Sequence, residues 1–184
     1  MIDCGIPFKR MKDELYKVDT LLITHSHSDH VKPATLDSIR TEFPRITVYA
    51  NADVAYRYDV DKVVGTKPFD LPKGRHILPF DGIHDVPVTY FIIQENDLNI
   101  LYATDTSDIE IPDDMKIDYF FLESNYDTRK ITEMAKQYKR RGYDPYSSST
   151  LRHMSTQRCK EIYFVYRRSR DSPLIELHKS SRFY

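Results

Sequence analysis

Cysteine is scarce in this sequence of 184 residues, which contains only Cys4 and Cys159. Neither has a Cys-x-x-Cys partner, so the sequence predicts no disulfide framework. Long apolar runs are also missing: no stretch approaches the roughly 20 residues that a membrane-spanning helix needs. The first residues do not have the pattern of a secretory signal peptide. We therefore expect a protein of the reducing cytoplasm that does not enter a membrane.

The sequence has almost no net charge, at −1, but its charges are unevenly distributed. Residues 1–128 contain 13 Lys and Arg against 23 Asp and Glu, whereas residues 129–184 contain 14 against 5. A basic segment that follows an acidic one indicates a surface for a polyanion such as nucleic acid. The alternative is that these basic residues only solvate exposed helix faces.

The remaining composition is that of a folded protein, with 40% hydrophobic and 12% aromatic residues. This is enough for the core of one domain over residues 1–184. Short runs rich in β-branched residues predict strands, at 18–24, 46–50, 88–94, 99–103, 119–122 and 174–178. Capping signals and apolar periodicity predict helices, at 11–16, 33–43, 54–58, 131–141 and 155–168. This interleaving indicates an α/β fold in which two sheets pack together and helices cover them.

A dense histidine motif follows the first predicted strand, in His25-Ser26-His27-Ser28-Asp29-His30. Residues two apart on an extended strand point to the same side, so His25 and His27 can bind one metal ion together. Asp29 and His30 follow where the chain turns towards the next helix, and there they can face a second ion. Imidazole suits zinc, and a mixed set of histidines and carboxylates suits a hydrolytic pair of zinc ions. The spacing therefore predicts a metal centre rather than a chance cluster.

Two metal ions need more ligands than this motif supplies, and three later residues can provide them. His84 follows a glycine turn and is the expected third histidine of the first ion. Asp105 ends a buried strand, where its carboxylate could bridge both ions, and His153 could complete the second site. Each residue alone is as often a hydrogen-bonded structural residue, but together with the motif they form a stronger prediction. His76 and His178 stand in less informative contexts.

The order of these residues resembles a known family. The motif followed by His84, Asp105 and His153 resembles the ligand series of the metallo-β-lactamase superfamily, and Ile2-Asp3-Cys4-Gly5 resembles the strand end that precedes it. Three motifs resemble the YycJ/WalJ-type group of bacterial and phage proteins described as DNA exonucleases: Ala103-Thr104-Asp105, Leu122-Glu123-Ser124-Asn125 and Arg152-His153-Met154-Ser155. The resemblance implies an αββα sandwich, in which two mixed β-sheets are flanked by helices.

The sequence differs from the family pattern in three places. The strands that normally precede Ile2-Asp3-Cys4-Gly5 are missing, so the expectation is either that one sheet has an uncovered edge or that this is a shortened gene product. Pro33 stands where many members have glycine, and Arg152 replaces the glycine before the late histidine. None of these differences removes an expected metal ligand.

The resemblance also implies two metal ions, zinc or alternatively manganese. The expected ligands form a first set, a second set and a bridge: His25, His27 and His84; Asp29, His30 and His153; and Asp105. Asp29 and Asp105 are the expected catalytic residues. Asp29 would orient a metal-bound hydroxide or take its proton, and Asp105 would be the bridge. Three residues are expected to fix ligand orientation: Asp85, Glu123 and Asn125. Glu123 is equally typical of an ordinary surface or capping carboxylate.

Substrate choice is not decided by this type of fold, which serves several reactions. The basic C-terminal third favours a phosphodiester, so the prediction is a phosphodiesterase or DNA nuclease with nucleic acid as its partner. Backbone contacts are expected from Lys136, Lys139, Arg140, Arg141, Arg152 and Arg158. Substrate contacts near the metals are expected from Asn125, Lys179, Ser180 and Ser181. The alternatives are a glyoxalase-II-like thioesterase, which shares the ligand type, and an inactive zinc-binding remnant.

Overall fold

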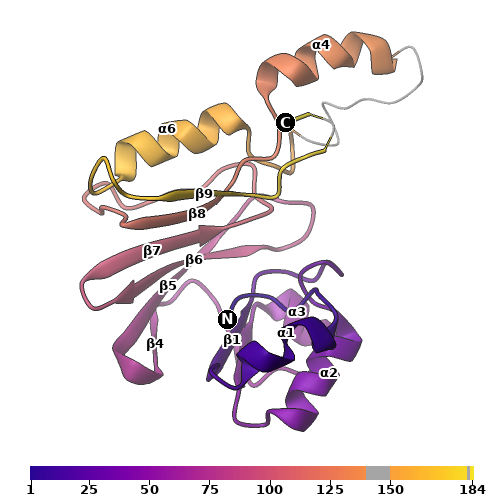
Figure 1. Cartoon of the computed structure of the whole chain (residues 1–184), viewed down its shortest axis with the longest axis vertical. Helices are drawn as coiled ribbons and strands as arrows, with labels where there is room; N and C mark the ends of the chain where they lie inside the picture. Colours follow the sequence, from indigo (N-terminus) through magenta and orange to yellow (C-terminus); the bar gives the residue numbers. More distant parts are fainter. Residues whose placement is uncertain (140–149, 182) are drawn as a thin grey trace.

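The structure, a computed structural model, describes residues 1–139, 150–181 and 183–184. Two β-sheets form separate layers (Figure 1). The smaller sheet is parallel and has the strand order β1-β2-β3, with β1 at Thr20–Ile23, β2 at Thr47–Ala50 and β3 at Lys62–Val63. Residues 1–4 run beside the outer edge of β1, where Ile2 and Leu22 form an isolated parallel bridge.

The larger sheet is mixed and has the order β4-β5-β6-β7-β8-β9. Its strands are β4 (Phe69–Leu71), β5 (Arg75–Asp81), β6 (Thr89–Glu95), β7 (Leu98–Ala103), β8 (Tyr119–Glu123) and β9 (Leu174–Leu177). The pairs from β4 to β7 are antiparallel, whereas β7, β8 and β9 are parallel to one another. The 3-10 helix η1 (Pro72–Gly74) joins β4 to β5.

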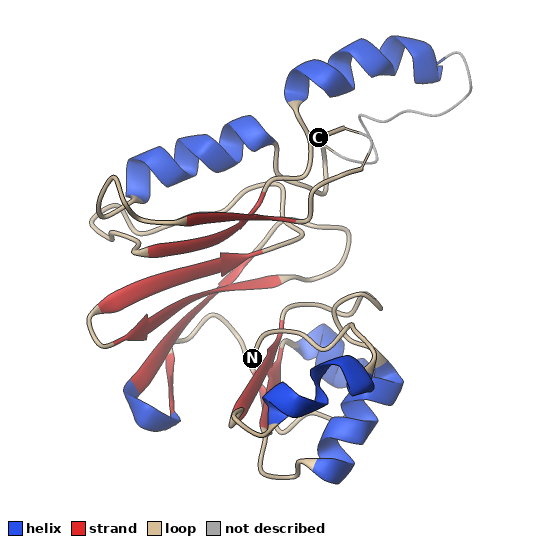
Figure 2. Ribbon diagram, in the orientation of Figure 1, coloured by secondary structure: helices blue, strands red, loops and turns tan. Residues whose placement is uncertain are grey.

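Helices lie on the outer side of each sheet (Figure 2). Those beside the smaller sheet are α1 (Phe8–Leu15), α2 (Pro33–Glu42) and α3 (Ala52–Arg57). The helix α6 (Thr156–Tyr166) runs along the larger sheet, and α4 (Thr128–Lys139) lies beyond one end of that sheet. No helix in the described part of the chain is long and apolar enough to span a membrane. The expected α/β fold with two sheets between helices is confirmed.

Several helices begin at the predicted signals. Pro33 occupies the first turn of α2, where its missing N–H costs no hydrogen bond. Asn51 caps α3 by accepting a hydrogen bond from the Val54 N–H, and Ser155 caps α6 by accepting one from the Arg158 N–H. These caps fix the direction in which each helix leaves the preceding strand or loop.

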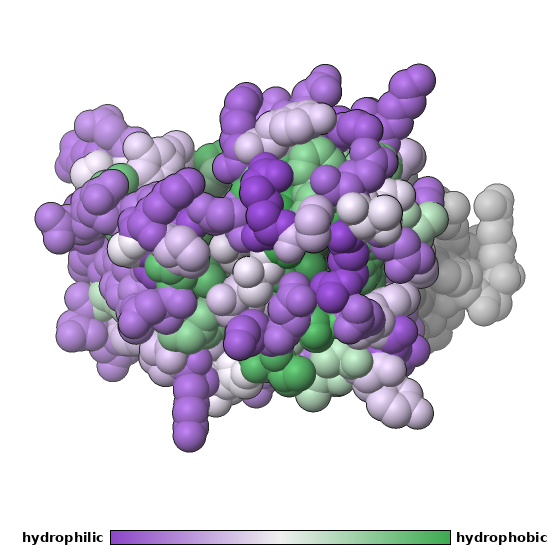
Figure 3. Space-filling model, turned by 90° about the horizontal axis from the view of Figure 1, so that it is seen from below, coloured by the Kyte–Doolittle hydropathy of each residue, from purple (hydrophilic) through white to green (hydrophobic). Residues whose placement is uncertain are grey.

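The core is divided into layers by the alternation of side chains along the strands. Leu21 and Ile23 of β1 pack with α1 and α2, whereas Leu22 between them packs between the two sheets. On β6, Phe91 faces the space between the sheets and Ile92 faces α6. Both strands are therefore buried on both sides. Seen from below, the surface is mostly hydrophilic, with hydrophobic residues showing between polar ones (Figure 3).

The structure corrects two predicted boundaries and leaves a third outside the described residues. The hairpin between β6 and β7 turns through two residues, Asn96 (φ 49°) and Asp97 (φ 63°), rather than through four. Short polar residues tolerate this left-handed conformation, which matches the twist of the strands. His178, expected at the end of the last strand, has a φ of 53° and lies beyond β9. The predicted end of the fourth helix at Arg141 lies outside the described residues.

Candidate metal centre

The side chains that could bind a metal ion gather at the carboxyl ends of strands from both sheets. His25 follows β1, while Asp105, Glu123 and His178 stand at or just after the ends of β7, β8 and β9. Because β7, β8 and β9 are parallel, their ends meet at one edge of the larger sheet. The Thr89 N–H donates to the Thr24 carbonyl over 2.9 Å and joins the two sheets beside this edge.

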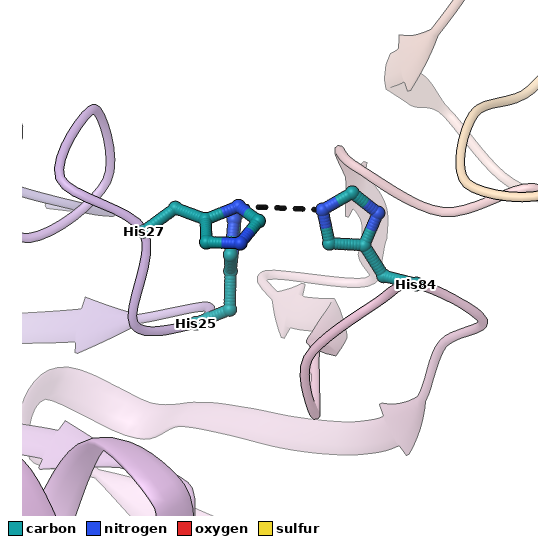
Figure 4. A group of neighbouring side chains, drawn as sticks. All are labelled: His25, His27 and His84. Carbon is teal, nitrogen blue, oxygen red and sulfur yellow. Dashed lines mark hydrogen bonds between the residues drawn. The ribbon is translucent and has the colours of Figure 1, made fainter. Parts of the chain in front are cut away.

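The first donor group consists of three histidines whose ligand nitrogens lie within 4.8 Å of one another: His25, His27 and His84. His25 and His27 come from the chain after β1, and His84 faces them from the loop that follows β5 (Figure 4). His84 Nε2 lies 3.4 Å from His27 Nδ1. The predicted first set of ligands is therefore brought together.

His25 is the most buried member of this group. Its Nδ1 lies 3.0 Å from the Thr24 hydroxyl, which itself donates to the Asp3 carboxylate over 2.9 Å, so Nδ1 carries the proton. Its Nε2 is buried and has no hydrogen-bond partner among the described residues. Burial, followed by the charge of His30, lowers the pKa of His25 to about 3. A neutral imidazole with a buried, unpartnered lone pair fits a metal ligand.

His84 is oriented in a similar way. Its Nδ1 lies 2.9 Å from the carbonyl oxygen of Arg152, which can only accept, so Nδ1 carries a proton, while Nε2 faces His27 Nδ1 and Asp85 Oδ1. Burial lowers the pKa of His84. A metal-binding histidine usually donates its other N–H to such an outer acceptor. The main chain at Arg152 thus supports a ligand of the first group.

The second donor group contains His25, His30 and Asp105. His30 Nε2 lies 3.0 Å from Asp105 Oδ2, and its Nδ1 lies 2.7 Å from Asp3 Oδ2. Burial disfavours the charged ring, but the hydrogen bonds that His30 donates to Asp105 and Asp3 raise the pKa of His30 to about 10. A cation at this position would therefore have to displace a proton from His30.

Asp105 belongs to two donor groups and stands between them. It is 2% exposed and has a φ of 52°, which turns its carboxylate into the cluster directly after β7. Burial alone would raise the pKa of Asp105, but hydrogen bonds from His178 and His30 hold it well below its usual range. A buried carboxylate that stays ionised beside several imidazoles suits the predicted bridging ligand.

The third donor group consists of Asp105, Glu123, His153 and His178. His178 Nδ1 lies 2.8 Å from Asp105 Oδ1, whereas His153 Nδ1 lies 3.8 Å from the same oxygen. Bonds to Asp105 and Glu123 raise the pKa of His178 to about 10. His178 was missed by the sequence reasoning, although it was expected to end a strand, which is the position that singled out Asp105.

Glu123 is fully buried, which excludes the interpretation as an ordinary surface carboxylate. One of its oxygens lies 2.7 Å from His153 Nδ1, and the other accepts the N–H of Thr106 over 2.7 Å. Glu123 thus fixes the ring of His153 from behind, as expected for a residue that orients a ligand.

Asp29 is less well enclosed than the other predicted ligands. Its side chain is 68% exposed, and its Oδ2 lies 3.8 Å from His30 Nε2. The loop that carries it is held by the Cys4 N–H, which donates to the His30 carbonyl over 2.7 Å. Gly5 packs directly against this loop, because a Cβ there would lie 1.7 Å from the Asp29 carbonyl oxygen. The position of this loop therefore depends on the absence of a side chain at Gly5.

The residues predicted to contact substrate are already engaged within the protein. Asn125 Nδ2 donates to the His178 carbonyl over 2.8 Å, and the Ser180 N–H donates to the Asn125 carbonyl over 2.8 Å. Lys179 pairs with Glu176 at 2.9 Å. Asn125 thus supports the segment that carries His178.

Only some of the basic residues predicted to follow a nucleic-acid backbone have side chains that the structure describes. Arg158 pairs with Asp108 at 2.9 Å and with Glu161 at 3.3 Å. Arg140, Arg141 and the side chains of Lys136 and Lys139 lie outside the described residues.

Two facing sheets between helices, with a histidine and carboxylate cluster at the strand ends, define a protein of the metallo-β-lactamase fold. The family comparison agrees, because the family model described as the beta-lactamase superfamily domain matches residues 2–161. The chain belongs to this family. Comparison with curated protein sequences gives no match.

Solved structures show the same fold. YhfI of Bacillus subtilis, a metallo-β-lactamase fold protein, is 17% identical with a TM-score of 0.68, and the alignment covers 97% of this chain and 73% of YhfI. Human tRNase Z, short form, is 18% identical with a TM-score of 0.65 over 98% of this chain and 82% of that one. A diphosphatase of the PhnP family is 20% identical with a TM-score of 0.63 over 99% and 69%.

Proposed function

We propose that this protein is a dinuclear metal-dependent phosphodiesterase that acts on nucleic acid. The observation that carries the proposal is the buried donor cluster around His25 and Asp105, in which His25 Nε2 has no hydrogen-bond partner among the described residues. An unpartnered buried nitrogen is costly in a folded protein unless a ligand binds it. The surrounding imidazoles and carboxylates are the donors that zinc prefers.

The residues divide naturally into two sites. His25, His27 and His84 would hold the first ion, and His30 and Asp105 would begin the second. His178 and His153 compete for the remaining place, and the shorter distance to Asp105 favours His178. Two divalent cations so placed would act as Lewis acids and lower the pKa of a bound water. Asp29, at the exposed rim, is the residue that can accept a proton from that water.

The surrounding residues keep the ligands in position. Asp3 holds the Nδ1 proton of His30 and, through the Thr24 hydroxyl, orients His25. Glu123 accepts the Nδ1 proton of His153, which leaves Nε2 of that ring for a metal or for substrate. Rings fixed by such outer partners lose little freedom on binding, which favours a preformed centre.

A phosphodiester substrate is supported by charge and by fold relatives. The segment 129–184 is basic, whereas the rest of the chain is acidic. Two structures of the same fold bear the names of a tRNase and a diphosphatase. The likeness to YycJ/WalJ-type exonucleases, which depends on the Ala103-Thr104-Asp105 and Leu122-Glu123-Ser124-Asn125 motifs, makes DNA the first substrate to test.

The test is one assay of zinc-loaded protein on end-labelled duplex DNA, single-stranded DNA and RNA, beside a thioester such as S-lactoylglutathione. We expect cleavage of a nucleic acid and about two zinc ions per chain by elemental analysis. Brisk thioester hydrolysis without nucleic-acid cleavage would make the protein a glyoxalase-II-like thioesterase instead. Zinc binding without turnover of any substrate would indicate an inactive zinc-binding protein.

A further inference from the structure

Arg152 stands beside the first donor group in two ways. Its main-chain carbonyl accepts the Nδ1–H of His84 over 2.9 Å. Its side chain turns back over the same group, where Nη1 lies 2.8 Å from Asp85 Oδ2. The other oxygen of Asp85 lies 3.0 Å from His84 Nε2 and 3.4 Å from His27 Nε2. Only one carboxylate therefore separates the guanidinium from the ligand nitrogens.

The guanidinium of Arg152 remains available to a ligand from solvent. Its side chain is 47% exposed, whereas that of His84 behind it is 2% exposed. A guanidinium has five N–H donors, and Asp85 is the single ion-pair partner of Arg152 in the described part of the chain. The donors that Asp85 does not use can bind the oxygens of an incoming anion in the bidentate manner typical of arginine.

Binding of a cation at the first donor group would make the guanidinium of Arg152 attract an anion more strongly. A cation held by His27 and His84 would lie next to the Asp85 carboxylate, and would share the negative charge that now neutralises Arg152. The net charge around the guanidinium would then become more positive. Arg158 does not have this relation, since it is neutralised by Asp108 and Glu161 at the start of α6.

We propose that Arg152 binds the phosphate group of the substrate beside the first metal site and that Asp85 holds the guanidinium in place. This inference rests on the proposed function, which it deepens by naming the residue that selects an anionic phosphate over a neutral ester. The motif that Arg152-His153-Met154-Ser155 resembles has glycine at the first position, so the guanidinium is a feature of this chain. A glycine could supply the carbonyl for His84 but no charge.

The test compares Arg152→Gln and Arg152→Lys with the wild type. Binding of inorganic phosphate to the zinc-loaded protein is measured by calorimetry, and hydrolysis of bis(p-nitrophenyl) phosphate gives KM and kcat. Loss of a charge-assisted hydrogen bond should weaken phosphate binding roughly ten- to hundredfold. KM should rise by more than kcat falls. Lysine should restore part of the binding, because it keeps the charge without the planar fork.

Arg170→Gln is the matched control, since Arg170 is an exposed arginine in the turn between α6 and β9, away from the donor groups. It should bind phosphate like the wild type. Zinc content of every variant is also measured. It should stay unchanged, because the carbonyl of residue 152 that accepts the His84 N–H remains in each variant. Phosphate binding that is equal in Arg152→Gln and Arg170→Gln would overturn the inference, and so would a loss of zinc that accounts for the weaker binding.

Failure of this inference is distinguishable from failure of the proposed function. Calorimetry with phosphate requires no turnover, so it decides the role of Arg152 even in a protein that cleaves no phosphodiester. A wild type that hydrolyses phosphodiesters but binds phosphate independently of Arg152 would refute the inference and leave the proposed function standing.

Discussion

Replacement of Gly5 by alanine should displace the loop that carries Asp29 and His30. An added Cβ would lie 1.7 Å from the carbonyl oxygen of Asp29, 2.0 Å from its carbonyl carbon and 2.6 Å from the amide nitrogen of His30. All three atoms belong to the backbone, so no side-chain rotation can relieve the overlap. The loop must therefore retreat by about 1.3 Å or more before the contact reaches the 3.0 Å that real Cβ atoms keep.

This displacement has a cost in stability and a separate cost in metal binding. Overpacking a closely packed site costs about 1–3 kcal/mol, and a backbone clash belongs at the upper end of that range. For a protein of this size, about 3 kcal/mol corresponds to a fall in Tm of roughly 6 to 12 °C. A ligand displaced by about 1 Å no longer holds the productive geometry of a metal site. We therefore expect His30 to lose most of its contribution to the second site.

The assay is thermal unfolding followed by circular dichroism, together with zinc titration of refolded protein. Gly65→Ala is the control, because a Cβ at Gly65 meets no atom within 4 Å and the residue does not have a positive φ. It should change Tm little, or raise it slightly by restricting the unfolded chain. The reasoning is refuted if Gly5→Ala and Gly65→Ala have the same Tm and the same zinc content.

Three further outcomes are expected. Asp105→Ala should lose bound zinc and abolish turnover. His76→Ala should change neither zinc content nor rate, because His76 lies on the exposed side of β5, 2.6 Å from Asp70. His178→Ala should lower zinc content to about one ion per chain, and an unchanged content would assign the second site to other ligands. Asp19→Asn should lower the free energy of unfolding by about 1 kcal/mol at pH 7, because the hydrogen bond from the Arg75 guanidinium holds the pKa of Asp19 well below its usual range. A lowered pKa stabilises the fold above the unfolded value near 4, so urea unfolding should show the difference shrinking as pH falls below that value.

The motif at the end of β1 made much of the site predictable from local sequence. His25 and His27 were assigned to one ion because side chains two apart on an extended chain share a side. The structure brings both together with His84, although β1 ends at Ile23 and His27 lies in a bend rather than on the strand. The caps at Asn51 and Ser155 were also predictable, since a cap depends only on its own side chain and the next few backbone N–H groups.

Residues whose role depends on distant partners were harder to predict. His178 looked uninformative because its ligand-like position arises from Asp105, which is more than seventy residues earlier in the chain. Lys179 was expected to contact a phosphate, a prediction that stays open, and the sequence did not indicate its ion pair with Glu176 at 2.9 Å. The turn at Asn96 and Asp97 is shorter than the sequence predicted. The reason is that strand register, and not the local turn signal alone, decides where a hairpin reverses.

The sequence by itself therefore determined the fold class, the identity of most donor residues and the order in which they occur, because periodicity, caps and motif spacing are local properties. The tertiary structure decided which donors share a site, which carboxylates lie behind them and where the positive charge of Arg152 points. Those features come from the meeting of strand ends from two sheets. Contacts between residues far apart in sequence leave no local pattern, and only the packed sheets bring them within hydrogen-bonding distance.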